Sequence, residues 1–136
     1  MELRKFEIDG REVEFVNQFR GTRNGFAHDT AMFVDGHKIT AATCHYINRT
    51  WEAYTYQSVM LKAVYNRIEE LRQYAKDRFM EARGYKKLTA DRKAKFEEEC
   101  KQNAEIAFYE AVREELSNGT ENTQITAEEL VQLVRE

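Results

Sequence analysis

The sequence contains no proline and only six glycines, so few positions interrupt regular secondary structure. It also lacks a long hydrophobic run, because no apolar stretch approaches the roughly 20 residues that a membrane-spanning helix needs. The first residues carry no apolar stretch behind a basic pair, so we expect no secretory signal. From these absences we expect a soluble cytosolic protein that has no membrane partner.

Cysteine, serine and histidine are scarce, and none of them forms a known chemical motif. Cys44 and Cys100 form neither a CxxC pair nor a disulfide framework, which fits a reducing compartment. No serine lies in a nucleophile-elbow pattern, and neither GxGxxG nor a Walker loop occurs. His28, His37 and His45 show no metal-ligand spacing. We therefore expect no cofactor, no bound metal and no nucleophilic catalysis.

Length and composition predict one folded domain that covers residues 1–136. A chain of 136 residues is large enough to bury a core but small for two. Hydrophobic residues at 42% and charged residues at 33% exclude a disordered chain. The net charge of −3 does not favour binding to long nucleic acid, although local basic clusters can still hold a small anion.

Two Asp-Gly pairs separate segments that are typical of β-strands. The first pair lies between segments that alternate apolar and polar residues, and the second between segments rich in β-branched and aromatic residues. Asp-Gly tolerates the positive φ angles of a tight hairpin turn, so we predict two β-hairpins that form a small antiparallel sheet within residues 1–48. The turns are Asp9-Gly10 and Asp35-Gly36, and the predicted strands are 3–8, 12–15, 26–34 and 38–47.

A helical hairpin is predicted over residues 54–117. From about Tyr54 the apolar period changes to about 3.6, and no glycine lies between Tyr54 and Gly84, so one helix of about 45 Å can run to Arg83. Gly84 suits its C-terminal cap, and Thr89 can cap the second helix. The sheet is too small to cover such helices. On the inner side of the second helix we expect Phe96, Cys100, Ala104, Ala107, Phe108, Ala111, Val112 and Leu116.

The remaining residues, 118–136, are predicted to form a polar linker and a short final helix. Thr126 begins a capping box that ends at Glu129, directly before an apolar run that starts at Leu130. The predicted fold class is therefore α+β: about four strands, then a long helical hairpin, then a short tail helix.

Two segments place arginines beside amide or aromatic side chains. In the first, Arg20 and Arg23 accompany Asn24 in a loop that is bracketed by glycines. The second, residues 48–54, lies where the last strand is predicted to lead into the long helix. Such a junction exposes free amides and the positive end of the helix dipole, which favour a phosphate or carboxylate. Both segments are therefore candidate binding sites for an anion, and a solvated turn is the alternative for the first.

The second segment also offers groups that can recognise a nucleotide. Arg49 can add a charge-assisted pair of hydrogen bonds, and Trp51 and Tyr54 can stack on a base. The alternative is structural: Asn48 and Thr50 cap the helix, the two aromatic residues cover the edge of the core, and Arg49 pairs with a surface carboxylate. Both interpretations stay open at this point.

The run Phe19–His28, followed by Tyr46–Tyr54, resembles small proteins of phages and prophages, in particular the first family of Thoeris anti-defence proteins. The resemblance covers residues 1 to about 117 in overall layout. It implies a homo-oligomer, a dimer or a larger assembly such as a hexamer, that acts as a sponge. Such a sponge binds glyco-cyclic ADP-ribose isomers made by a TIR enzyme, and also cyclic oligonucleotides of the CBASS system, without any reaction.

The features of the sequence are compatible with that ligand. A cyclic ADP-ribose isomer presents a pyrophosphate, which requires arginines and helix-end amides, and an adenine, which requires aromatic faces. Helices longer than the sheet favour pairing with a partner chain, so we expect pockets at subunit boundaries, within reach of helix residues. The expected ligand-binding residues are Arg20, Thr22, Arg23, Asn24, Phe26, His28, Asn48, Arg49, Thr50, Trp51, Tyr54, Phe79 and Arg113.

Two other functions remain as alternatives. A phage inhibitor can bind a host defence protein directly, as an anti-CRISPR protein does, with an acidic helical surface that mimics nucleic acid. A small enzyme can degrade a cyclic nucleotide, and then His28 or His45 is the candidate general base. Changes at Arg23, Arg49 and Trp51 should abolish a sponge, changes to acidic helix residues should abolish a mimic, and only the enzyme should show turnover.

Overall fold

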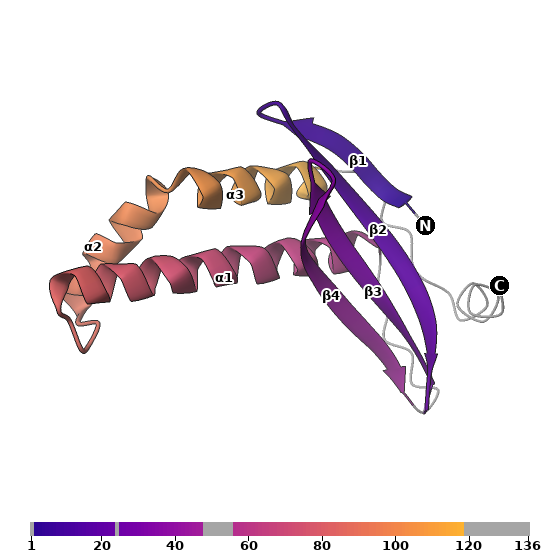
Figure 1. Ribbon diagram of the computed structural model, residues 1–136, viewed down its shortest axis with the longest axis horizontal. Helices are drawn as coiled ribbons and strands as arrows, with labels where there is room; N and C mark the ends of the chain where they lie inside the picture. The colour runs from indigo at the N-terminus through magenta and orange to yellow at the C-terminus, as the bar shows by residue number, and fades with distance from the viewer. Residues whose placement is uncertain (1, 24, 48–55, 119–136) are drawn as a thin grey trace.

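The computed structural model describes residues 2–23, 25–47 and 56–118. Within these residues the sheet comes first and the helices follow, which confirms the predicted α+β class (Figure 1). The strands are β1 (Glu2–Ile8), β2 (Arg11–Thr22), β3 (Gly25–Val34) and β4 (His37–Ile47), and the helices are α1 (Tyr56–Arg83), α2 (Ala90–Lys101) and α3 (Ala104–Ser117). The predicted linker and tail helix lie outside the described residues.

Both predicted Asp-Gly turns are present. Asp9 and Gly10 have φ values of 50° and 79°, and Asp35 and Gly36 have values of 50° and 80°. Two consecutive residues of positive φ are the signature of the type I′ turn, whose twist matches that of the strands it joins. The prediction of hairpins at these two places is confirmed.

The sheet is one antiparallel meander in the order β1-β2-β3-β4, rather than two hairpins joined by a loop. β2 is 12 residues long and pairs with β3 from Val13↔Val34 to Thr22↔Gly25. The predicted strand 12–15 was therefore too short, and most of the predicted loop 21–25 belongs to strands. The polar residues Asn17 and Gln18 end the apolar alternation in the sequence, yet the hydrogen-bonded ladder continues past them.

Helix α1 ends where the sequence predicts. Its 28 residues correspond to a length of about 42 Å. Gly84 follows with a φ of 65°, and the amides of Gly84 and Tyr85 donate to the carbonyls of Glu81 and Met80, which closes the last turn. Over the described residues, no helix is both long and apolar enough to cross a membrane.

The second arm of the helical hairpin is broken, which corrects the prediction of one continuous helix. Thr89 caps α2 as predicted, because its hydroxyl accepts from the amide of Arg92. However, α2 ends at Lys101, and the chain changes direction before α3 begins (Figure 1). Asn103 causes the restart: its Oδ1 accepts from the amides of Glu105 and Ile106 at 3.0 and 3.1 Å.

The break shifts the helix face that is buried. Ala104 and Ala107, predicted on the inner side, are exposed. Ile106 and Tyr109, which were not predicted there, are buried at 5% and 0% exposure. The inner positions that the structure confirms as buried are Phe96, Cys100, Phe108, Val112 and Leu116.

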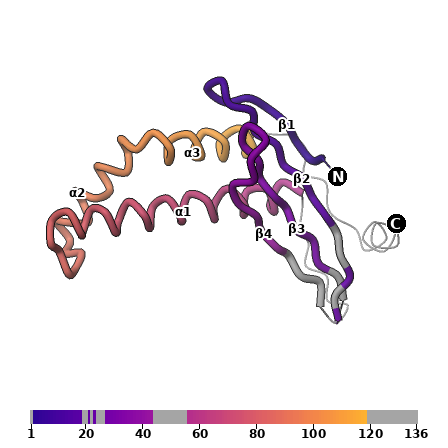
Figure 2. Tube along the Cα trace, viewed as in Figure 1, coloured from indigo at the N-terminus to yellow at the C-terminus, as the bar shows by residue number. Residues whose placement is uncertain are grey.

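The apolar core is divided into two clusters along the helices. The first lies between the sheet, the near half of α1 and α3, and it includes Phe15, Met32, Val64 and Val112. The second consists of Phe79, Phe96, Cys100 and Ile106, and it joins the far half of α1 to α2. Figure 2 shows why two clusters are needed: the helices project well beyond the sheet, which covers only one end of them.

Candidate functional site

The first predicted arginine segment lies at the turn between β2 and β3. Arg23 is in the turn and is exposed. For Arg20, Thr22 and Phe26 the structure describes only the strand positions, where Arg20 pairs with Ala27 and Thr22 with Gly25. These backbones meet at one end of the sheet. The predicted site residues Asn24, Asn48, Arg49, Thr50, Trp51 and Tyr54 lie outside the described residues, and their roles stay predictions.

His28, predicted as a ligand-binding residue, is instead fully buried in β3. Its Nδ1 lies 2.9 Å from Oδ1 of Asn17, and the same oxygen accepts a hydrogen bond from Thr30 at 2.7 Å. Burial lowers the pKa of His28 to about 4, so the ring is neutral at pH 7. Across the ladder, His28 pairs with Cys44 and not with His45. In this structure His28 is a core residue, not part of an accessible site.

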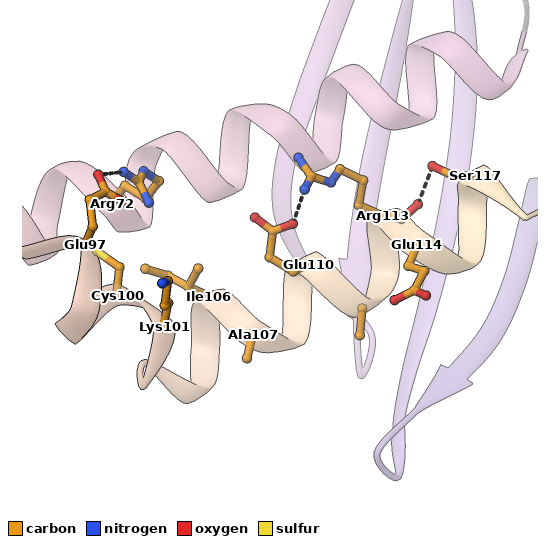
Figure 3. A pocket seen from close by; sticks show the side chains of 11 residues that line it. Arg72, Glu97, Cys100, Lys101, Ile106, Ala107, Glu110, Arg113, Glu114 and Ser117 are labelled. Carbon is orange, nitrogen blue, oxygen red and sulfur yellow. Dashed lines mark hydrogen bonds and ion pairs between the residues drawn. The ribbon is translucent and has the colours of Figure 1, made fainter. Parts of the chain in front are cut away.

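Two adjoining hollows lie along the helices, at the break between α2 and α3. The larger has a volume of about 720 Å³ and is lined from α1 by Arg72 and otherwise by residues of α2 and α3. We call it the helical groove. Its lining residues are Arg72, Glu97, Cys100, Lys101, Ile106, Ala107, Glu110, Ala111, Arg113, Glu114 and Ser117 (Figure 3).

The helical groove carries arginines that are each held by a carboxylate. Arg72 reaches from α1 to Glu97 of α2 with a contact of 2.5 Å, and Arg113 pairs with Glu110 one turn away (Figure 3). The hydrogen bond that Arg72 donates to Glu97 raises the pKa of Arg72 above its usual value. A guanidinium has five donors, and one carboxylate oxygen occupies only part of them. Both arginines therefore retain donors for a further anion.

The floor of the groove is apolar and chemically inert. Ile106 and Cys100 are buried at 5% and 6% exposure. Burial raises the pKa of the Cys100 thiol, so it is protonated at neutral pH and is a poor nucleophile. The described lining contains no histidine. This arrangement suits binding of a ligand that is part apolar and part anionic.

Two of the predicted helix residues line these hollows, one in each. Arg113 lines the helical groove, and Phe79 lines the smaller hollow, of about 310 Å³, with Cys100 common to both. Phe79 is only 3% exposed, because its ring packs edge-on against Phe96 and Tyr85 at 5.7 and 5.9 Å between centroids. Its first role is therefore to hold α2 against α1.

Sequence reasoning missed Arg72, Lys101 and Glu110 as groove residues. The sequence could have predicted the position of Glu110, because Glu110, Glu114 and Ser117 follow helical spacing on one face of α3. No local sequence pattern identifies Arg72 as a groove residue, since it is 25 residues from Glu97 and the two meet only after α2 folds back on α1.

The predicted residues that the structure describes do not form one site within a single chain. Arg23 lies at the β2–β3 turn, His28 in the core, Phe79 near the end of α1 and Arg113 on α3. Comparisons with protein-family models, curated proteins and solved structures found no significant match to this chain. The assignment of a function therefore depends on the chemistry of the helical groove and on the sequence pattern.

Proposed function

We propose that this protein is a sponge for a small cyclic nucleotide. It binds a glyco-cyclic ADP-ribose isomer made by a TIR enzyme in the bacterial cytosol and keeps it from its effector. The observation that carries the proposal is the helical groove, in which Arg113, Arg72 and Lys101 surround an apolar floor. Its volume of about 720 Å³ is within the range of small-molecule pockets, about 300–1,000 Å³.

The charges of the groove favour a pyrophosphate-bearing ligand. Arg72 and Arg113 come from different helices, so their free donors can address the two phosphates from two sides. Ile106 and Cys100 offer an apolar surface for a base. Cyclic oligonucleotides share the same phosphate and base chemistry, and we include them as second ligands of this proposal.

The lining of the groove supports capture without cleavage. The described lining holds a protonated thiol and three carboxylates, of which Glu97 and Glu110 are ion-paired, and it lacks a histidine that could transfer a proton. Of the two candidate bases, His28 lies inside the core and is paired across the ladder with Cys44 rather than with His45. The ligand is therefore expected to leave the protein intact.

A second copy of the chain would complete the site. Within one chain, the arginine-bearing β2–β3 turn and the helical groove lie on different parts of the molecule. The helices project beyond the sheet, and α1 exposes Tyr65 and Tyr74 at 54% and 56%. Such exposed aromatic residues are typical of interfaces. We therefore propose a homo-oligomer in which one copy adds its turn to the groove of another.

The test is calorimetry with cyclic ADP-ribose isomers and cyclic oligonucleotides, followed by heat release of the bound ligand and mass spectrometry. Tight binding and recovery of the intact ligand are expected. Recovery of a cleaved product would replace the sponge with an enzyme. Absence of binding to every one of these ligands would overturn the proposal and direct the search to a host protein partner.

Arg113→Gln tests the groove itself. Loss of a charged hydrogen bond is expected to weaken binding by about tenfold or more, because such a bond contributes about 1.5–3 kcal/mol. The matched control is Lys38→Gln, which removes the same charge from an exposed position next to the β3–β4 turn. Equal affinities of the two variants would exclude Arg113 from the binding site.

A direct inhibitor that mimics nucleic acid is less well supported. The acidic run of α2 is occupied within the chain: Glu97, Glu98 and Glu99 pair with Arg72, Lys101 and Arg83. Glu97 and Glu99 hold α2 against α1, whereas Glu98 pairs within α2, so the run is not a free row of charges.

A further inference from the structure

The end of the helical hairpin that is remote from the sheet carries an excess of positive charge. The segment from Arg83 to Lys95, which we call the basic tip, contains six basic residues and one acidic residue, Asp91. Its net charge is therefore +5, while the whole chain carries −3, so the rest of the chain carries −8. Figure 1 shows this loop and the start of α2 at the opposite end of the molecule from the sheet.

Most cations of the basic tip lack a neutralising partner. At the sheet end, Arg4, Lys5 and Arg11 are each paired with a glutamate. In the basic tip, only Arg83 has a carboxylate within 4 Å among the described residues, that of Glu99. The exposed cations without such a carboxylate are Lys86, Lys87, Lys93 and Lys95.

Arg92 fixes the geometry of this surface. Its guanidinium lies 3.8 Å from the centre of the Tyr85 ring, and its Nη1 donates to the carbonyl of Lys87 at 3.1 Å. These contacts hold the loop against the first turn of α2, where Thr89 caps the helix. The lysines are thus presented on an ordered end of the helical hairpin rather than on a free segment.

The shape and chemistry of the basic tip select among anionic partners. None of the four exposed lysines lines either of the two hollows described above, so they do not enclose a small ligand there. Its large apolar side chains, Tyr85 and Leu88, pack against the Phe79 cluster and are not free to insert into a lipid surface. An extended chain of phosphates can contact several such exposed lysines at once.

We infer that the basic tip is a second binding site, separate from the helical groove, for the phosphate backbone of nucleic acid. The contact is made end-on, because the remaining charge of −8 repels the same polyanion from the rest of the surface. Recognition is independent of base sequence, since lysines act as point charges on the phosphates. The whole-chain charge of −3, from which we expected no binding to long nucleic acid, is the sum of this positive segment and the negative remainder.

The test is fluorescence anisotropy of the full chain with short labelled single-stranded and duplex DNA of mixed sequence, at several salt concentrations. A Kd of about 10⁻⁶ to 10⁻⁴ M that weakens steeply with salt is expected. Lys86→Gln combined with Lys87→Gln should weaken binding by about tenfold and reduce the log–log salt slope on duplex DNA by about 1.8, which corresponds to two lost phosphate contacts.

The matched control combines Lys5→Gln with Lys38→Gln, which gives the same net charge but leaves the basic tip intact. This control should bind like the original chain. An equal loss of DNA affinity in both double variants would mean that net charge alone determines binding, and would overturn the inference. It would also be overturned if neither DNA binds at low salt while vesicles rich in anionic lipid do.

Discussion

His28 and Asn17 face each other inside the protein, with Nδ1 of the histidine 2.9 Å from Oδ1 of the amide. Both residues are almost fully buried, at 0% and 1% exposure, and they come from the paired strands β3 and β2. A buried imidazole is stable in its neutral form, because charging it away from water is unfavourable. The pair therefore links the stability of the sheet to pH.

The free energy of unfolding should fall as the pH is lowered from about 6.5 to about 4. In the unfolded chain His28 has a pKa near 6.5, and in the folded protein burial lowers its pKa to about 4. The unfolded state therefore binds a proton first, and the group is neutral in both states above pH 6.5. The expected loss is about 3 kcal/mol, measured by urea unfolding over this pH range.

Two histidine variants separate the effect of His28 on stability from the effect of carboxylates that titrate in the same pH range. His28→Gln keeps a donor for Asn17 but cannot titrate, so stability should depend less on pH between 6.5 and 4. His37→Gln changes an exposed histidine and should leave the dependence as it is. A full pH dependence in His28→Gln would contradict the assignment.

Phe79→Ala should lower the free energy of unfolding by about 3 kcal/mol, because a buried phenylalanine is replaced by a cavity. The loss should be local, since Phe79 belongs to the cluster that joins α1 to α2 and not to the sheet core. Hydrogen exchange should show lost protection in α2 and at the end of α1. Phe79→Leu, which keeps most of the volume, is the control; uniform loss over the sheet would contradict two separate clusters.

Asn103→Ala should destabilise the protein by about 1 kcal/mol. The side chain accepts from two free amides at the start of α3, and alanine cannot replace that acceptor. Thermal unfolding measures the change, and Asn103→Asp or Asn103→Ser should retain most of the stability. If Asn103→Ala leaves the stability unchanged, the break between α2 and α3 is fixed by packing alone.

Gly36→Ala should destabilise the protein by about 1–2 kcal/mol, because the residue has a φ of 80°. A methyl group at this position meets no atom within 4 Å, so the effect comes from the backbone and not from a clash. Gly36→Asn, which tolerates the left-handed conformation, should be milder in denaturant unfolding. Equal effects of the two substitutions would point to another cause.

Local chemistry accounts for the parts of this fold that the sequence predicts. The Asp-Gly turns, the cap at Gly84 and the cap at Thr89 each depend on a few neighbouring residues, and all are present where they were predicted. The same holds for the end of α1 at Arg83, because no proline or glycine precedes it inside the helix. Turns and caps are decided by backbone angles and nearby amides, which the sequence contains directly.

Contacts between distant segments decided the rest. The extension of β2 past Asn17 depends on its ladder with β3, and the burial of His28 depends on which face of that ladder the helices cover. The helical groove exists because Asn103 breaks the second arm and Arg72 meets Glu97 across the fold. Composition set the total charge of −3, whereas the folding of α2 back on α1 paired the acidic residues there and left the lysines of the basic tip exposed. Packing and charge pairing are cooperative properties of the whole chain, so no local pattern determines them.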